Sequence, residues 1–377
     1  MTFSSASSRR PARHNVVIRL LIVDDSALMR RFLGRIFEAE SDFEVTSARD
    51  GAEALDTIRE FKPHVVTLDI AMPRMDGLTC LDRIMVEHPC PVVMVSTLTE
   101  HGADETLRAL EMGAIDFIPK PQGTISLHAD ELAPLIVERV RAAAAVKVPR
   151  SRRLAERVRF RAEAYSTLSA EPLPSPPIKA DVDLAADCVV LIGCSTGGPP
   201  ALDAVLGVLP SEFPWPIVVA QHMPASFTGP LARRLDKLCE LSVVEVTKPT
   251  LVEPGHVYIG RGDADIVLTR RNEVLMAIAM PAAAEHRWHP SVDRLVRSAI
   301  EHVPAERLVG VLMTGMGNDG AAAIAELRTR GGHTIAESRH SAVVWGMPGE
   351  LVKLDGAVDI IELPQIGERL LELAQWQ

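Results

Sequence analysis

The sequence contains few cysteines, and their arrangement argues against two of the structures that cysteines commonly build. The five cysteines are odd in number, are scattered, and never form a C-x-x-C pair; they are Cys80, Cys90, Cys188, Cys194 and Cys239. A disulfide framework requires an even set, and a structural zinc site requires closely paired ligands. We therefore expect a cytoplasmic protein without structural disulfides or zinc.

Long apolar runs and excess positive charge are also missing. No segment approaches the roughly 18 uninterrupted apolar residues of a membrane span, and residues 1–15 lack the apolar stretch of a signal peptide. Neither membrane insertion nor secretion is expected. The net charge of −10 disfavours nonspecific nucleic-acid binding. Nothing after residue 180 has the pattern of a helix-turn-helix with a basic recognition face, which argues against a DNA-binding output.

Short apolar runs alternate with amphipathic segments in the first part of the chain, which is typical of a parallel α/β fold. The residues from Ser26 to Ala39 predict a helix, because Leu28, Phe32 and Phe37 recur at helical spacing and Ser26 can cap its first turn. Five strands are predicted, at Arg19–Val23, Glu44–Ala48, Val65–Leu68, Pro91–Val95 and Ile115–Ile118.

A change of composition separates this part from the next. Residues 147–161 carry seven basic residues and one acidic residue, and residues 171–177 contain four prolines. The stretch therefore predicts a linker. Its basic face is either solvated or docked on an acidic partner or a membrane surface, and a solvated face is the more common case.

The α/β alternation resumes after the linker. Residues 257–278 differ from the rest of this half, because β-branched runs interrupted by glycine and asparagine predict an antiparallel hairpin. The other predicted elements are strands at Val189–Ile192, Ile217–Ala220, Leu308–Leu312 and Thr334–Ala336, and helices at Pro200–Leu209 and Asp319–Arg330.

Acidic residues stand at the ends of two predicted strands of the first half. Asp24 and Asp25 end the first strand and Asp69 ends the third, and the carboxyl ends of strands in an open parallel sheet face the ligand crevice. Three carboxylates at one edge are unfavourable unless a hard cation such as Mg²⁺ lies among them. Ser96 and Lys120 end the fourth and fifth strands, and the proline after Lys120 allows a cis bond. Beside Mg²⁺ and the Lys120 ammonium, Asp69 is a candidate nucleophile toward a phosphoryl donor.

Four motifs of the first half resemble those of two-component receiver domains: LIVDDSALMR at residues 21–30, DIAMPRMDG at 69–77, VMVS at 93–96 and KP at 120–121. The resemblance implies that a histidine kinase phosphorylates the domain in the presence of Mg²⁺. The residues it assigns are the phosphoacceptor Asp69, the metal ligands Asp24, Asp25, Asp69 and Ala71, and the switch residues Ser96 and Lys120.

The second half contains a candidate nucleophile, base and acid in three separate loops. Ser195 lies in a G-x-S-x-G sequence between a predicted strand and helix, where a tight turn exposes the hydroxyl. His222 and Asp319 each follow a later strand, and the glycines around Met316 leave amides suitable for an oxyanion hole. A phosphate-binding turn is the alternative, although Ser195 occupies the place of the second glycine in G-x-G-x-x-G. Spacing alone leaves three other histidines open as the base: His256, His286 and His289.

Residues 188–365 resemble the catalytic domain of the chemotaxis protein-glutamate methylesterases. The motifs that carry the resemblance are GCSTGGP at 193–199, QHMP at 221–224, FT at 227–228, TGMGNDG at 314–320 and GMP at 346–348. It implies a Ser195, His222 and Asp319 triad with Thr196 and Met316 near the oxyanion, and no cofactor for the esterase. The implied substrates are glutamate methyl esters, and also glutamines, on the cytoplasmic helices of chemoreceptors, and the implied phosphodonor is the chemotaxis histidine kinase.

The resemblance also fixes the expected organisation and leaves one alternative function. We expect an α/β protein of two domains: a disordered lead-in (1–17), a five-stranded doubly wound receiver (18–140), a linker (141–184) and a larger doubly wound parallel-sheet hydrolase domain with an antiparallel hairpin annex (185–377). A monomer is expected.

The family's segments Ala-Pro-Gly-Asp-x-His and Arg-His-Arg-Pro-Ser are altered at residues 260–265 and 287–291. These departures allow a non-catalytic signalling adaptor as the alternative, and they affect substrate docking and domain contacts more than the triad.

Overall fold

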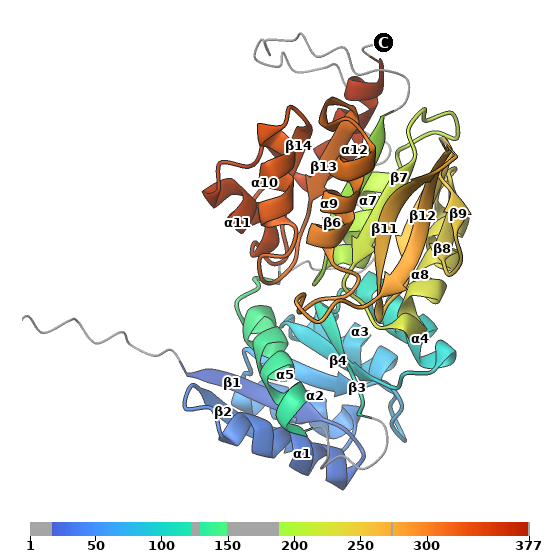
Figure 1. Cartoon of the computed structure of the whole chain (residues 1–377). Helices are drawn as coiled ribbons and strands as arrows, with labels where there is room; N and C mark the ends of the chain where they lie inside the picture. Colours follow the sequence, from blue (N-terminus) through green and yellow to red (C-terminus); the bar gives the residue numbers. More distant parts are fainter. Residues whose placement is uncertain (1–16, 122–128, 149–187, 273, 376–377) are drawn as a thin grey trace, which may run out of the picture.

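The computed structural model describes residues 17–121, 129–148, 188–272 and 274–375 (Figure 1). The lead-in up to residue 16 and the linker between 149 and 184 lie outside the described residues, and the domain boundaries stay predictions. None of the helices in the described ranges is both long and apolar enough to cross a membrane.

The first half forms a five-stranded parallel sheet in the order β2-β1-β3-β4-β5. Strands β3 and β4 are buried at every residue, as expected for a sheet covered by helices on both faces. The elements are β1 (Ile18–Val23), α1 (Ala27–Glu38), β2 (Phe43–Ala48), α2 (Gly51–Phe61), β3 (Val65–Asp69), α3 (Gly77–Glu87), β4 (Val92–Ser96), α4 (Glu100–Glu111), β5 (Asp116–Pro119) and α5 (Ala129–Ala144).

Helix α1 begins and packs for the reasons expected from its sequence, with one correction. The side chain of Ser26 accepts a hydrogen bond from the backbone of Met29 and caps the helix. Met29, Phe32 and Phe37 are buried against the sheet, but Leu28 is 60% exposed. The predicted apolar stripe is therefore wrong by one position at its start, because Met29 and not Leu28 faces the sheet in the first turn.

The second half forms a seven-stranded parallel sheet in the order β15-β14-β13-β6-β7-β10-β8. Helices α7, α8 and α12 pack on one face, and α9, α10 and α11 on the other. The elements are β6 (Val189–Cys194), α7 (Gly198–Leu206), β7 (Ile217–Gln221), α8 (Ala225–Leu238), β8 (Ser242–Val246), β9 (Thr250–Leu251), β10 (His256–Gly260), β11 (Ala264–Arg271), β12 (Val274–Pro281), α9 (Val292–His302), a short 3₁₀ helix (Ala305–Arg307), β13 (Leu308–Leu312), α10 (Ala321–Thr329), β14 (His333–Glu337), α11 (Met347–Lys353), β15 (Asp359–Ile361) and α12 (Leu363–Gln375).

The predicted hairpin at residues 257–278 is right in part. Strands β11 and β12 form the antiparallel hairpin, and β9 adds a third strand to it. Strand β10, however, belongs to the main sheet, where it pairs in parallel with β7 and β8. Its sequence is as β-branched as the hairpin, so local composition does not separate the two. The predicted α/β class with a doubly wound sheet in each half is confirmed.

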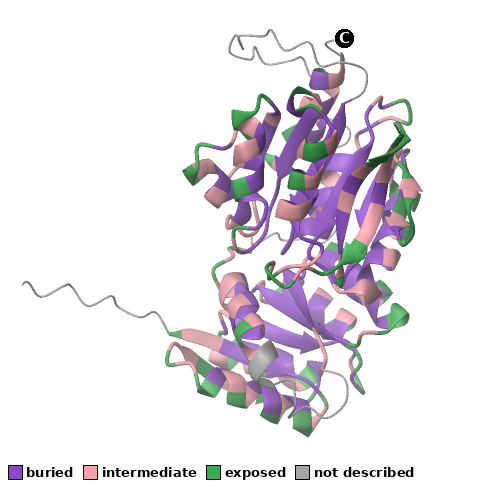
Figure 2. Cartoon of the chain, viewed as in Figure 1, coloured by how far each residue is buried: buried purple, intermediate pink, exposed green. Residues whose placement is uncertain are grey.

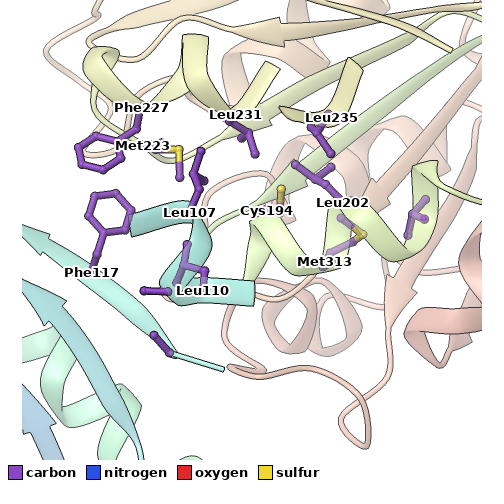
Figure 3. Close-up of a cluster of buried hydrophobic side chains, with 14 of the residues drawn as sticks. Leu107, Leu110, Phe117, Cys194, Leu202, Met223, Phe227, Leu231, Leu235 and Met313 are labelled. Atoms are coloured by element: carbon purple, nitrogen blue, oxygen red, sulfur yellow. The ribbon is translucent and has the colours of Figure 1, made fainter. Parts of the chain in front are cut away.

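A shared apolar cluster joins the two halves. Leu107 and Leu110 of α4 and Phe117 of β5 pack in one cluster with residues of the second half (Figure 3). Phe117 stacks on Phe227 of α8, with ring centroids 4.4 Å apart. The strands of both sheets are largely buried in Figure 2, and the shared cluster packs the two halves against each other.

Candidate active site

The acidic residues of the first half meet where its chain order reverses, between β1 and β3. One carboxylate oxygen each of Asp24, Asp25 and Asp69 lies within 4.8 Å of the others. The Lys120 ammonium lies 3.2 Å from Asp24 Oδ2 and 2.8 Å from Asp69 Oδ2. Asp69 Oδ1 also accepts the backbone N–H of Ala71 at 3.3 Å. The structure thus brings together four of the side chains predicted for this site.

Burial dominates the electrostatics of this cluster. It raises the pKa of Asp69 to about 6, although Lys120 acts in the opposite direction. Burial also raises the pKa of Asp24. The pKa of Lys120 is raised, because its two carboxylate partners outweigh the effect of its own burial. A single ammonium therefore leaves the carboxylates undercompensated, and this donor set fits a hard divalent cation such as Mg²⁺.

Ser96 and Pro121 lie at the same edge of the sheet. The Ser96 hydroxyl is buried and donates to the carbonyl of Gly102, 3.1 Å away, so it is turned toward α4 rather than bonded to Asp69. The cis bond allowed before Pro121 is wrong, because the one cis peptide bond in the described residues joins His289 to Pro290. Lys120–Pro121 adopts the trans form that most such bonds prefer.

Ser195 lies at the corresponding reversal of the second sheet, between β6 and β13. Its backbone N–H donates to the carbonyl of Thr314 at 2.9 Å, and its carbonyl accepts the N–H of Gly198 at 2.8 Å. Gly197 has a φ of +78°, a left-handed value that favours glycine. A Cβ on Gly198 would meet the Gln221 side chain at 1.9 Å. The small residues of this turn are therefore required by its geometry.

His222 follows β7 and is bonded to the predicted acid. Its Nε2 lies 2.8 Å from Asp319 Oδ2, and both side chains are almost fully buried. With the Nε2 proton donated to that carboxylate, Nδ1 is the basic nitrogen, and Nδ1 is buried without a hydrogen-bond partner among the described residues. The carboxylate–imidazole pair is thus formed, whereas His222 makes no hydrogen bond to the Ser195 hydroxyl in this arrangement.

The other three histidines lie elsewhere. His256 is at the opposite, amino end of β10, where it bonds the carbonyl of Pro254. His289 bonds Asp265. His286 comes near Asp293 and Asp319 without a hydrogen bond to either among the described contacts. His222 is therefore the histidine that the fold pairs with Asp319.

Asp319 is held as an anion by the first turn of α9. It accepts the backbone N–H groups of Val292 at 2.7 Å and Asp293 at 3.1 Å, and the Ser291 hydroxyl at 3.0 Å. Although burial raises the pKa of Asp319, its bond to His222 and these backbone donors outweigh that effect and lower it. Sequence reasoning missed these donors. The signal was present, since Ser291 before an amphipathic run is a typical N-cap.

A buried acid at the end of the neighbouring strand β14 holds the glycine-rich loop that follows β13. Glu337 accepts the N–H of Thr314 at 2.7 Å, and burial raises the Glu337 pKa to about 7. The Thr314 hydroxyl donates to the carbonyl of Thr196, which ties this loop to the serine turn. The backbone N–H groups of Thr196 and Met316 donate no hydrogen bond to another described residue. Both amides are therefore available to an oxyanion.

The first half covers this site. The Thr196 hydroxyl, next to Ser195, donates to Asp116 Oδ2 of β5 at 2.5 Å, and Asp116 also pairs with the buried Arg139 of α5. On the other side, Arg287 forms an ion pair of 2.6 Å with Glu138 of α5. Ser195 is only 6% exposed. In this arrangement the serine is almost fully buried beside the contacts between the two halves.

Comparison with known proteins gives the same two parts. Residues 20–130 match the family model of the response regulator receiver domain, and residues 190–370 match that of CheB methylesterase. A relative from Rhodopseudomonas palustris (strain BisB18), named protein-glutamate methylesterase/protein-glutamine glutaminase 2, is 53% identical over 358 residues, which cover 94% of this chain and 98% of the relative. A relative from Rhodospirillum rubrum, named protein-glutamate methylesterase/protein-glutamine glutaminase 3, is 51% identical over 93% of this chain and 95% of its own. The crystal structure of the Thermotoga maritima CheB methylesterase catalytic domain is 38% identical, covers 50% of this chain and 98% of that chain, and has a TM-score of 0.48.

Proposed function

Because the chain belongs to the protein-glutamate methylesterase/protein-glutamine glutaminase family, we propose that it is a phosphorylation-regulated serine hydrolase of chemoreceptors. It removes the methyl group from glutamate methyl esters and converts glutamines to glutamates. The observation that carries the chemistry is the 2.8 Å bond between His222 and Asp319 on the same sheet edge as Ser195.

In the proposed mechanism, Ser195 Oγ attacks the carbonyl carbon of the substrate side chain, and His222 Nδ1 accepts the hydroxyl proton. Asp319 keeps the imidazole in the required tautomer and stabilises its protonated form. The amides of Thr196 and Met316 hold the oxyanion. The proton then passes from His222 to the leaving methoxide, or to the departing amide nitrogen of a glutamine, which releases methanol or ammonia. Water, deprotonated by the same histidine, hydrolyses the acyl-enzyme and restores Ser195.

His222 must come within hydrogen-bond distance of Ser195 during this sequence. Catalytic hydrogen bonds are commonly long or absent before substrate binds and form in the reacting complex. The unpartnered Nδ1 of His222 is consistent with that rearrangement, because a buried imidazole nitrogen without a partner is unfavourable.

We further propose that phosphorylation of Asp69 by a histidine kinase weakens the contacts that cover Ser195. Asp24, Asp25 and Asp69 would hold Mg²⁺, with the carbonyl of Ala71 as a further ligand. When bound, the ion offsets the negative charge of the incoming phosphoryl group. Lys120 already contacts Asp24 and Asp69 and is placed to respond to their charge.

Methanol release from methylated receptor membranes tests the esterase proposal. Ser195→Ala should lower the rate by at least about 10³-fold, whereas Ser211→Ala, which changes an exposed serine of the same domain, should leave it unchanged. Both variants should still accept a phosphoryl group from a small phosphodonor. Hydrolysis retained by Ser195→Ala would place the nucleophile elsewhere. A wild-type chain that releases no methanol in either phosphorylation state would favour a non-catalytic adaptor.

A small phosphodonor tests the regulation. The phosphorylated full chain should hydrolyse the ester faster than the unphosphorylated chain, because substrate then reaches Ser195. Equal rates in the two states, with phosphorylation of Asp69 verified, would refute the covering role of the receiver.

A further inference from the structure

The loop between β12 and α9 lies directly against the proposed catalytic base. The Trp288 indole is stacked on the His222 imidazole, with ring centroids 5.6 Å apart and an angle of 11° between the planes. The indole nitrogen also lies 3.3 Å from the position that a Cβ on Gly317 would occupy. Trp288 therefore lies beside both the imidazole and the loop that carries Met316 and Asp319.

The two ends of this loop are anchored on one fully buried carboxylate. Asp265 Oδ2 accepts the backbone N–H of Ala283 at 3.0 Å, and Asp265 Oδ1 accepts that of Ser291 at 2.7 Å. His289 and Arg294 bind the same carboxylate, each at 2.8 Å. These bonds outweigh the burial of Asp265 and lower its pKa, so it stays charged. A charged anchor with four donors fixes the path of the loop between Ala283 and Ser291.

The two segments that depart from the family's motifs therefore belong to one structural unit. Asp265 stands at the altered histidine position of the first segment, and Trp288 and His289 are the altered residues of the second. The pair formed by Asp265 and His289 joins the two segments directly. Both altered segments thus contribute to one hydrogen-bonded unit in this chain.

A stacked ring matters here because, within the described part of the chain, the hydrogen bond from Nε2 to Asp319 is the one that the His222 ring makes. The second side-chain torsion of histidine has a broad, roughly two-fold preference, so a single hydrogen bond does not by itself set the tilt of the ring. A flat partner parallel to the imidazole restricts that tilt and so directs Nδ1. Misplacement of a reacting group by about 1 Å can lower a rate by about 100-fold.

We propose that Trp288 is a positioning residue that fixes the plane of the His222 imidazole, and that Asp265 anchors the loop that presents it. This inference rests on the proposed esterase function and adds a residue to it. Trp288 acts through His222 and needs no contact with the substrate.

The first test separates kcat from KM in the phosphorylated full chain, with methanol release as the readout. Trp288→Leu, which keeps apolar volume but loses the flat ring, should lower kcat by about 10- to 100-fold and change KM by less than about threefold. Trp288→Phe should retain kcat within about threefold, because a phenyl ring preserves the stack. Asp265→Asn should lower kcat in the same direction as Trp288→Leu. Rates are normalised to the folded fraction from thermal unfolding.

Two kinetic results would overturn the proposal. One is a Trp288→Leu kcat within twofold of the wild type. The other is a loss confined to KM, which would make Trp288 a substrate-binding residue. If Trp288→Leu does not fold, Trp288→Phe decides, since a phenylalanine variant that folds normally but loses kcat as severely would also refute the positioning role.

A second test does not depend on the esterase function. In proton NMR of the unphosphorylated chain, the imidazole protons of His222 should be shifted upfield by the indole, and the shift should be lost in Trp288→Leu. Absence of that change would show that the rings are not stacked and would overturn the proposal. If the upfield shift is present while the wild type releases no methanol, the proposed function fails and the stacking stands.

Discussion

Replacing Asp116 by asparagine should raise the esterase rate of the unphosphorylated chain. Asp116 is the residue of the receiver half whose side chain bonds Thr196, the neighbour of Ser195, at 2.5 Å. The substitution keeps the size of the side chain and removes its charge. It therefore weakens the covering contact without opening a cavity at the interface.

The size of the effect follows from the kind of bond that is lost. A hydrogen bond to a charged group contributes about 1.5 to 3 kcal/mol, against about 0.5 to 1.5 for a neutral one. Asparagine can still accept from Thr196, so the expected loss is about 1 to 1.5 kcal/mol, or roughly tenfold in the equilibrium between covered and open arrangements. Arg139 loses a charged partner but keeps its bond of 2.7 Å to the carbonyl of Phe117, which limits the cost to the receiver fold.

Methanol release from receptor membranes, with and without a phosphodonor, measures this shift. The unphosphorylated rate of Asp116→Asn should be about tenfold that of the wild type, and the phosphorylated rate should be unchanged, so activation falls by the same factor. Asp56→Asn, an equivalent change on the exposed face of α2, should behave as wild type. Asp116 does not hold the cover in place if Asp116→Asn folds, accepts a phosphoryl group normally, and has an unphosphorylated rate within twofold of the wild type.

Three smaller predictions concern other groups. Glu138→Gln removes the ion pair with Arg287. Because such exposed pairs contribute less than about 1 kcal/mol, the unphosphorylated rate should rise less than about fivefold. A larger rise than in Asp116→Asn would show that the ion pair, and not the Asp116–Thr196 bond, is the stronger contact between the halves. Chelation of Mg²⁺ should abolish activation by a phosphodonor while the basal rate of methanol release persists, and activation that survives chelation would argue against the metal site. Glu337 has a pKa raised from 4.5 to about 7, so the folded state keeps a proton that the unfolded state releases, and stability falls as the pH rises from about 4.5 to 7. Glu337→Gln should therefore raise the free energy of unfolding at pH 8 by at most about 3 kcal/mol. Thermal unfolding should show this gain shrinking toward pH 4.5. A gain that does not depend on pH would show that the ionisation of Glu337 is not its cause.

The strands and most helices could be predicted from the sequence because local pattern determines them. Apolar runs such as Val65–Val66 in the fully buried strand β3 suit a parallel sheet covered on both faces, and Ser26 marks the start of α1. The assignment of β10 could not be predicted, since its membership in the main sheet depends on pairing with β7 and β8. Those partners are set by tertiary packing, which local composition does not encode.

The candidate site could likewise be predicted from the sequence only in part. Ser195, His222 and Asp319 were accessible to sequence reasoning because each follows a strand, and strand ends of a parallel sheet converge. Contacts between the two halves, such as Thr196 with Asp116, carry no local signal. The same holds for the stack of Trp288 on His222, where the sequence showed only a departure from a motif and the structure gives it a partner.

Strand β5 connects the two sites in space. It begins at Asp116, which bonds Thr196 beside the proposed nucleophile, and it leads into Lys120, which contacts Asp69. A strand advances about 3.3 Å per residue, so these two side chains are separated by only about 13 Å of rigid backbone. Under the proposed regulation, a phosphoryl group on Asp69 that draws Lys120 toward it would pull on the end of the strand that holds Asp116 against the serine loop. Phe117 lies on the same strand and stacks on Phe227. If β5 moves, the Phe117–Phe227 stack and the Asp116–Thr196 hydrogen bond would be lost together.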